Sequence, residues 1–144
     1  MIHLAFYKGN GNLFDRIVRF WTRSRYSHVE IVIGDFWYTS SPRDGGVVSR
    51  RMKGFDSRNW DFVRISTIPG NKIHIADLFF EQKGKRYDWL GIFLSQIFPL
   101  GVQNPKRWFC SEICAYVLDR SGANHLEKDY SWYSPGRLYE EVVS

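Results

Sequence analysis

Hydrophobic and polar residues alternate along much of the first half of the chain, and they follow a helical spacing through most of the second half. Alternation predicts β-strands, because successive side chains of a strand point to opposite faces. The predicted strands are residues 2–7, 28–34, 36–40, 47–53 and 60–65. Gly34 and Asp35 separate two of these strands and predict a hairpin between them.

Helical spacing predicts one helix before the second strand and several after the last strand. The first helix follows Asn12, a suitable N-cap, and its apolar residues are Leu13, Phe14, Ile17, Val18 and Trp21. The later helices cover residues 75–83, 88–98, part of 107–120, and 137–142. Strands grouped before helices predict an α+β domain in which an antiparallel sheet packs against helices.

The composition indicates one domain over residues 1–144. Hydrophobic residues make up 44% and aromatic residues 17%, which is enough to fill a single core in a chain of this length. The longest apolar region, residues 89–102, is interrupted by glycine, proline and polar residues, and a membrane-spanning helix needs about 18 apolar residues. The N-terminus lacks the basic and apolar segments of a signal peptide. We therefore expect a cytoplasmic monomer without a membrane span.

The charge of the chain favours an anionic partner. The net charge is +5, which suits nucleic acid, a phospholipid surface or an acidic polymer. Four arginines lie among aromatic residues in the first helix and the turn after it, and we call them the arginine patch: Arg16, Arg19, Arg23 and Arg25. Such a patch is typical of a site for phosphate, nucleic acid or a lipid head group. A solvated helix face gives the same pattern and is the commoner case.

The clearest chemical signal is the pair of Cys110 and His28. Cys110 lies where a loop becomes a helix, and a helix N-terminus stabilises a thiolate. His28 begins a strand, and a neighbouring imidazolium stabilises a thiolate in the same way. Cys114, one turn further along the helix, belongs to its buried stripe and is predicted to be a core residue. Two cysteines in one helical turn are poorly placed for a disulfide, and we expect no metal and no cofactor.

Glu30 is the favoured third member of this site. Alternation places Glu30 on the same face of the strand as His28, about 6.5–7 Å along it. From there a carboxylate can fix the tautomer of the imidazole and hold its positive charge. Thr39 and Ser40, on the following strand, are the alternatives. Glu112 is expected to face outward, because a carboxylate beside the nucleophile would oppose thiolate formation.

Three segments resemble the circularly permuted branch of the NlpC-type papain-like superfamily, which includes the YiiX-type and lecithin:retinol acyltransferase-like proteins. Residues 25–34, Arg-Tyr-Ser-His-Val-Glu-Ile-Val-Ile-Gly, resemble its histidine strand. Residues 109–112, Phe-Cys-Ser-Glu, are similar to its nucleophile segment, and residues 85–91 to the Tyr-Asp-x-x-Gly segment before it. The histidine strand precedes the cysteine helix in that branch, as it does here. The closest similarity is to small, uncharacterised proteins of tailed phages, which share the Ser-His-Val-Glu strand and the loop at residues 40–46.

The resemblance implies a permuted papain-like fold and a thiol hydrolase or acyltransferase, peptidase-like or amidase-like, that acts on amide, ester or thioester bonds. Cys110 would be the nucleophile and His28 the base. Many members carry the third polar residue on the strand after the histidine strand, where this chain offers only Thr39 or Ser40, so Glu30 is favoured on chemical grounds. The alternative function is an inactive binding module that engages a host protein or nucleic acid through the arginine patch.

Overall fold

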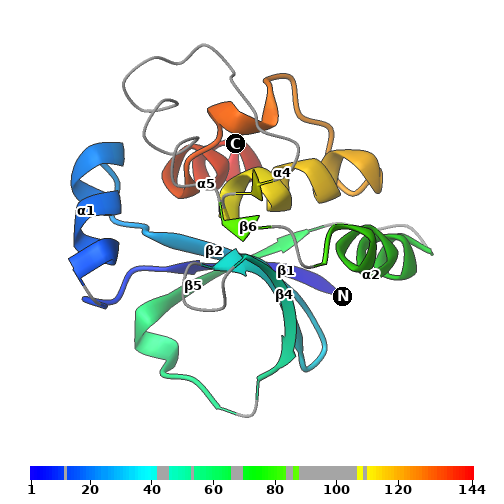
Figure 1. The fold of residues 1–144 in the computed structure, drawn as a ribbon, viewed down its shortest axis with the longest axis horizontal. Helices are drawn as coiled ribbons and strands as arrows, with labels where there is room; N and C mark the ends of the chain where they lie inside the picture. The colour runs from blue at the N-terminus through cyan, green and yellow to red at the C-terminus, as the bar shows by residue number, and fades with distance from the viewer. Residues whose placement is uncertain are drawn as a thin grey trace.

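The structure, a computed structural model, describes residues 1–11, 13–41, 46–52, 54–65, 70–83, 86–87, 107–108 and 110–144. Its strands are β1 (Ile2–Tyr7), β2 (His28–Ile33), β3 (Phe36–Ser41), β4 (Gly46–Arg51), β5 (Trp60–Ile65), β6 (Arg86–Tyr87) and β7 (Arg107–Trp108). Its helices are α1 (Leu13–Thr22), α2 (Asn71–Gln82), α4 (Cys110–Arg120) and α5 (Pro135–Val143), with 3₁₀ turns η1 (Ser57–Asn59) and η2 (Tyr130–Trp132). The helices α2, α4 and α5 lie over one face of the sheet, and α1 lies at its side (Figure 1).

The strands form one sheet in the order β5-β1-β2-β3-β4-β6-β7. The five long strands are antiparallel to their neighbours, while β6 and β7 are parallel to each other. Gly34 makes the tight turn between β2 and β3 with a φ of +60°, a left-handed conformation that glycine adopts without strain. The α+β class and the five predicted strands are confirmed. Strands of two residues, such as β6 and β7, are too short to show alternation, so the sequence did not predict them.

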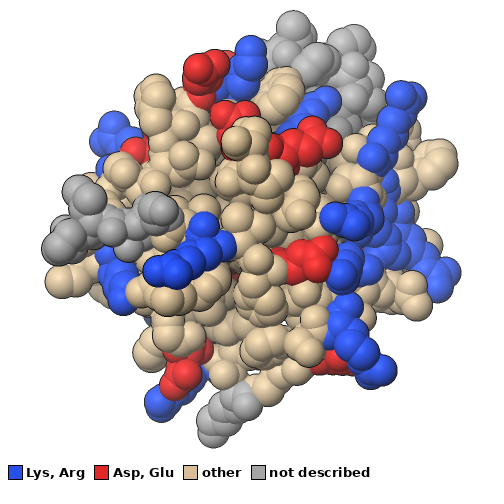
Figure 2. All heavy atoms as spheres, turned by 180° about the vertical axis from the view of Figure 1, so that it is seen from behind, with Lys and Arg blue, Asp and Glu red and all other residues tan. Residues whose placement is uncertain are grey.

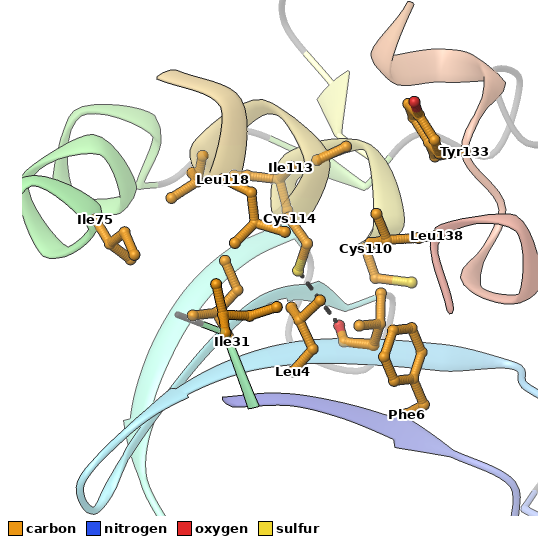
Figure 3. Close-up of a cluster of buried hydrophobic side chains, with 14 of the residues drawn as sticks. Leu4, Phe6, Ile31, Ile75, Cys110, Ile113, Cys114, Leu118, Tyr133 and Leu138 are labelled. Atoms are coloured by element: carbon orange, nitrogen blue, oxygen red, sulfur yellow. Dashed lines mark hydrogen bonds between the residues drawn. The ribbon is translucent and has the colours of Figure 1, made fainter. Parts of the chain in front are cut away.

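The main core lies between the sheet and α4. Leu4 and Phe6 of β1 and Ile31 of β2 point from the sheet toward Ile113 and Leu118 of α4 (Figure 3). The opposite face of the sheet carries a smaller cluster, which consists of Ala5, Val32 and Trp37 with Met52 and Trp60 packed against it. Alternate residues of β1 and β2 therefore enter different cores, as a strand period of two requires. The core holds α4 against β2, and this contact positions the candidate site.

Two of the predicted helix boundaries have clear local causes. Ser134 caps α5 by accepting a hydrogen bond from the backbone of Arg137, and Pro135 occupies the first turn. Gly122, just after α4, has a φ of +75°, which suits the end of a helix. The helix expected at residues 88–98 lies outside the described residues.

The helix α2 begins four residues earlier than the apolar spacing predicted. Its first residue, Asn71, is buried, and its side-chain amide donates a 2.6 Å hydrogen bond to the carbonyl of Ser121 just after α4. This contact joins residues that are far apart in the sequence. A pattern within residues 71–83 cannot show it, so the N-terminal turn of α2 was missed.

Candidate active site

Cys110 is the first residue of α4, and its side chain is completely buried in the main core. Its sulfur lies in the space between α4 and the sheet (Figure 3). The first backbone N–H groups of a helix have no partner within the helix, and together with the helix dipole they favour negative charge there. Cys110 therefore has one of the two features that activate a thiol.

Cys114 lies one turn further along α4 and behaves as a core residue, as predicted. Its side chain is also fully buried, and its thiol donates a 3.8 Å hydrogen bond to the carbonyl of Val29 in β2 (Figure 3). Burial, followed by the nearby charges of Cys110 and Glu30, raises the pKa of Cys114 well above its ordinary value. Cys114 therefore stays a neutral thiol over the physiological range.

His28 is the first residue of β2, at a point where β2 and β3 diverge. The two strands pair through Ile31, Val32 and Ile33 of β2, whereas β1 pairs with β2 along its whole length. Beyond this short ladder, the carbonyl of Val29 accepts a 2.8 Å hydrogen bond from the hydroxyl of Thr39 in β3.

The environment of His28 keeps its imidazole protonated at neutral pH. Burial alone would lower the pKa, but the electrostatic interaction and hydrogen bond with Cys110, followed by those with Glu30, raise the pKa to about 10. The side chain of His28 keeps 16% of its surface exposed, so it lies at the boundary between the core and solvent. The residue that most strongly favours the imidazolium is therefore Cys110.

Glu30 is the second partner of His28. Its side chain is fully buried, and Oε1 lies 3.0 Å from Nε2 of His28. The same oxygen accepts a 2.6 Å hydrogen bond from the guanidinium of Arg50 in β4. Of the alternatives, Thr39 donates its hydroxyl to the carbonyl of Val29, and Ser40 is completely buried. A buried carboxylate needs charged partners to offset the cost of removing it from water, and His28 and Arg50 are two such partners.

Arg50 is a site residue that the sequence analysis missed. It lies opposite Trp37 in the pairing of β3 with β4, and Trp37 in turn lies opposite Val32 in β2. Val32 is two residues beyond Glu30, so all of these side chains share one face of the sheet. The strand pairing could have identified Arg50 once the register of β4 was known. Residues 42–45, with Pro42 and Asp44-Gly45, predict a turn, but they do not by themselves set the register of β4.

The prediction that Glu112 faces outward is wrong, because its side chain is completely buried. The first turn of α4 is enclosed by the segment that contains η2. Ser111 donates its hydroxyl to the carbonyl of Tyr133, and Ser111 is also fully buried. Packing of η2 over the start of α4 therefore overrides the preference of a carboxylate for solvent.

The arginine patch is divided by the structure. Arg19 turns toward the body and donates hydrogen bonds to the carbonyls of Gly9 and Asn10. Arg16, Arg23 and Arg25 are exposed. Basic side chains gather along the edge of the molecule on which α1 lies, which is the right edge in Figure 2. Three of the four arginines therefore remain accessible to a partner.

Comparison with known proteins found no matching family model and no matching curated protein. The resemblance to the permuted papain-like branch therefore stays a prediction. Within the described part of the chain, no three His, Cys, Asp or Glu side chains come together in a way that could hold a metal ion.

Proposed function

We propose that the protein is a cysteine-dependent hydrolase or acyltransferase that acts on an amide, ester or thioester bond. Cys110 is the nucleophile, His28 the acid and base, and Glu30 the residue that orients His28. The observation that carries the proposal is the contact of Nε2 of His28 with the buried carboxylate of Glu30 at 3.0 Å, and it is supported by the interaction with Cys110, which opposes the effect of burial and raises the pKa of His28. An imidazolium held between a thiol at a helix start and a buried carboxylate is typical of an activated cysteine.

In the first step, the thiolate of Cys110 attacks the acyl carbon and forms a C–S bond. Nε2 of His28 is hydrogen-bonded to Glu30, which leaves Nδ1 as the ring nitrogen available to the sulfur of Cys110. The backbone N–H groups at the start of α4 are suited to hold the oxyanion. The imidazolium then gives its proton to the leaving amine, alcohol or thiol as the acyl–heteroatom bond breaks.

In the second step, the thioester on Cys110 is resolved. Neutral His28 removes a proton from water or from another acceptor, and the oxygen, nitrogen or sulfur of that acceptor attacks the thioester carbon. The C–S bond breaks, the product leaves, and the thiolate–imidazolium pair is restored. Water as the acceptor gives hydrolysis, and any other acceptor gives acyl transfer.

Glu30 and Arg50 support this chemistry from behind the imidazole. The carboxylate fixes the ring through Nε2, and Arg50 fixes the carboxylate through the same oxygen. A permuted papain-like fold would supply this arrangement, with the histidine strand before the cysteine helix. The α+β architecture and the order of β2 and α4 along the chain are consistent with that fold.

Burial of Cys110 sets a requirement for turnover. Its side chain has no exposed surface, so a substrate reaches the sulfur only after the groups that cover it move.

The direct test is to trap the acyl-enzyme. Incubation with small activated esters and thioesters, followed by intact-mass measurement, should show one added acyl group that maps to Cys110. Cys110→Ser and His28→Ala should each abolish the adduct, while Cys114→Ala should retain it. If no adduct forms on the folded wild-type protein, or if His28→Ala acylates as fast as wild type, the proposed reaction is wrong.

A second candidate function is the inactive binding module. The observation in its favour is the combination of a fully buried Cys110 with three exposed arginines near α1. Salt-sensitive binding of an oligonucleotide that survives Cys110→Ser and disappears in Arg16→Gln would support this function, provided that no acyl adduct forms.

A further inference from the structure

The helix α1 turns its apolar side away from the protein. The fractional exposure is 71% for Leu13, 44% for Ile17, 79% for Phe20 and 49% for Trp21, whereas Val18 is buried. Residues spaced three and four apart lie next to one another on a helix surface. The four exposed side chains therefore form one continuous patch, which we call the apolar face of α1.

The polar side of the same helix faces the protein. Asp15 accepts a 3.0 Å hydrogen bond from the hydroxyl of Ser27, just before β2. Arg19 donates to the carbonyls of Gly9 and Asn10 in the connection before α1. A helix on a protein surface ordinarily shows the opposite arrangement, with its apolar stripe toward the core. Since specific polar contacts fix α1 this way round, its outward apolar face is a property of the folded protein.

Basic residues border the apolar face. Arg16 is exposed on α1 itself, and Arg23 and Arg25 are exposed in the turn that follows. Arg23 has a φ of +52° at the position where a helix end usually carries glycine. An arginine there adopts a strained backbone without any stabilising role that the described contacts show. Its side chain is exposed just beyond the C-terminal end of α1.

A cavity of about 410 Å³ opens beside that end of α1. Three arginines and one acidic residue line it, namely Arg23, Arg25, Arg137 and Glu140, together with Tyr26 and Tyr139. Arg137 comes from the first turn of α5 and is held by a 3.0 Å hydrogen bond to the carbonyl of Trp132. The three guanidinium groups outnumber the one carboxylate, and guanidinium groups suit an anionic group such as a phosphate.

We propose that α1 docks the protein on the surface of an anionic phospholipid bilayer. The apolar face enters the boundary between head groups and acyl chains, and the cavity at its C-terminal end receives a phosphate head group. An interfacial helix combines large apolar side chains with basic residues along their border, as α1 does. Its ten residues span about 15 Å, half the thickness of the hydrocarbon core, so it suits an orientation along the surface.

No helix in the described part of the chain is both long enough and apolar enough to cross a membrane. Charge argues against a second copy of the chain as the occupant, because pairing two apolar faces would bring the bordering arginines of both copies together. Nucleic acid matches the arginines but leaves Leu13, Ile17 and Phe20 exposed to water. An anionic bilayer buries the apolar side chains of α1 and also pairs its phosphates with the bordering arginines.

Flotation with vesicles of phosphatidylcholine and 30 mol% phosphatidylglycerol tests the proposal, with pure phosphatidylcholine vesicles as the comparison. Wild type should bind the anionic vesicles, and Phe20→Ser should weaken binding roughly tenfold. Phe80→Ser is the matched control, because Phe80 is 77% exposed on α2, away from the apolar face of α1. This control should bind like wild type, and circular dichroism should show that both variants are folded.

Arg23→Gly separates charge from folding. Glycine suits the left-handed backbone, so this variant should be at least as stable as wild type, yet its binding to anionic vesicles should fall about fivefold. Raising the salt concentration should reduce that difference. We therefore expect weaker binding to anionic vesicles in Phe20→Ser and in Arg23→Gly, and wild-type binding in Phe80→Ser.

Four outcomes would overturn the proposal, and the first three concern vesicles and oligomeric state. They are no binding to anionic vesicles, equal losses in Phe20→Ser and Phe80→Ser, or a wild-type dimer that Phe20→Ser makes monomeric without any vesicle binding. The last result would identify a second copy as the occupant of the apolar face. Binding of an oligonucleotide that depends on the arginines, without vesicle binding, would assign the surface to nucleic acid.

Discussion

The carboxylate of Glu30 is the residue on which the buried charges of the site depend. It accepts from Nε2 of His28 at 3.0 Å and from Arg50 at 2.6 Å through the same oxygen. A carboxylate with no exposed surface costs several kcal/mol unless charged partners compensate, and removal of one partner leaves much of that cost. The stability of the site therefore depends on residues of two separate strands, β2 and β4.

Replacement of Arg50 tests this dependence. We expect Arg50→Met to lower the free energy of unfolding by about 1–2 kcal/mol, because Glu30 then keeps His28 as its only charged partner among those described. Urea denaturation measures the change. Arg51→Met is the matched control, since Arg51 is the next residue of β4 and pairs with Asp35 while both stay mostly exposed. An exposed pair contributes about 0–1 kcal/mol. Equal losses in the two variants would contradict the buried role of Arg50.

The charge of His28 predicts how stability changes with pH. Its pKa in the folded protein is about 10, which is above the value of about 6.5 of an unfolded histidine. The stabilisation from the imidazolium is therefore complete below about pH 6.5 and is lost as the pH rises through about 10. We expect wild type to lose more free energy of unfolding than His28→Gln between pH 7 and pH 10. Parallel curves from urea denaturation would show that His28 carries no raised pKa.

At the scale of elements, the divergence of β2 from β3 connects the fold to the site. Alternation predicted both strands and the faces of β2 correctly, because those features depend on neighbours in the sequence. The short ladder between β2 and β3, the direct contact of Glu30 with Arg50 and the burial of Glu112 depend on packing between distant segments. Cys110, His28 and Glu30 could therefore be picked out as candidates from sequence patterns, whereas the contact of Arg50 and the burial of Glu112 could not.

The orienting role of Glu30 can be separated from the structural role of Thr39. Thr39→Val removes the hydroxyl that bridges β3 to Val29, and we expect a loss of about 1 kcal/mol in stability with no effect on the reaction of Cys110 with iodoacetamide. Glu30→Gln removes a charge that raises the pKa of His28. In Glu30→Gln, His28 should lose its proton at a lower pH than in wild type. The alkylation rate of Cys110 should therefore begin to change at a lower pH in this variant. A shifted profile in Thr39→Val, with an unshifted one in Glu30→Gln, would assign the orienting role to Thr39.

The helix α1 shows a different limit of sequence patterns. Apolar residues at helical spacing predicted the helix correctly, as the structure confirms from Leu13 to Thr22. Spacing alone cannot say which way the stripe faces. That direction is fixed by the contacts of Asp15 and Arg19 with the body of the protein. The orientation of α1, which matters most for a partner, therefore needed the structure.

At the scale of the whole molecule, the site and the main core are the same region. Cys110 and Cys114 both belong to the main core cluster, and both side chains have no exposed surface. A reagent can reach such thiols by a local opening or by global unfolding. These routes predict different rates, because global unfolding exposes both cysteines together, whereas an opening at the start of α4 exposes Cys110 first.

Single-cysteine variants distinguish the two routes. We expect Cys110 in Cys114→Ala to react with iodoacetamide at least about a hundredfold faster than Cys114 in Cys110→Ala, because a stability of about 5 kcal/mol or more suppresses reactions that need global unfolding. Rates from intact-mass measurements at pH 7 in the absence of denaturant test this, and reactions in concentrated urea, where both cysteines should react alike, provide the control. Low urea should accelerate Cys114 strongly and Cys110 weakly, since local openings expose little surface. If both cysteines react slowly and at the same rate, Cys110 becomes accessible only on unfolding, and a nucleophile that opens to substrate in the folded protein is excluded.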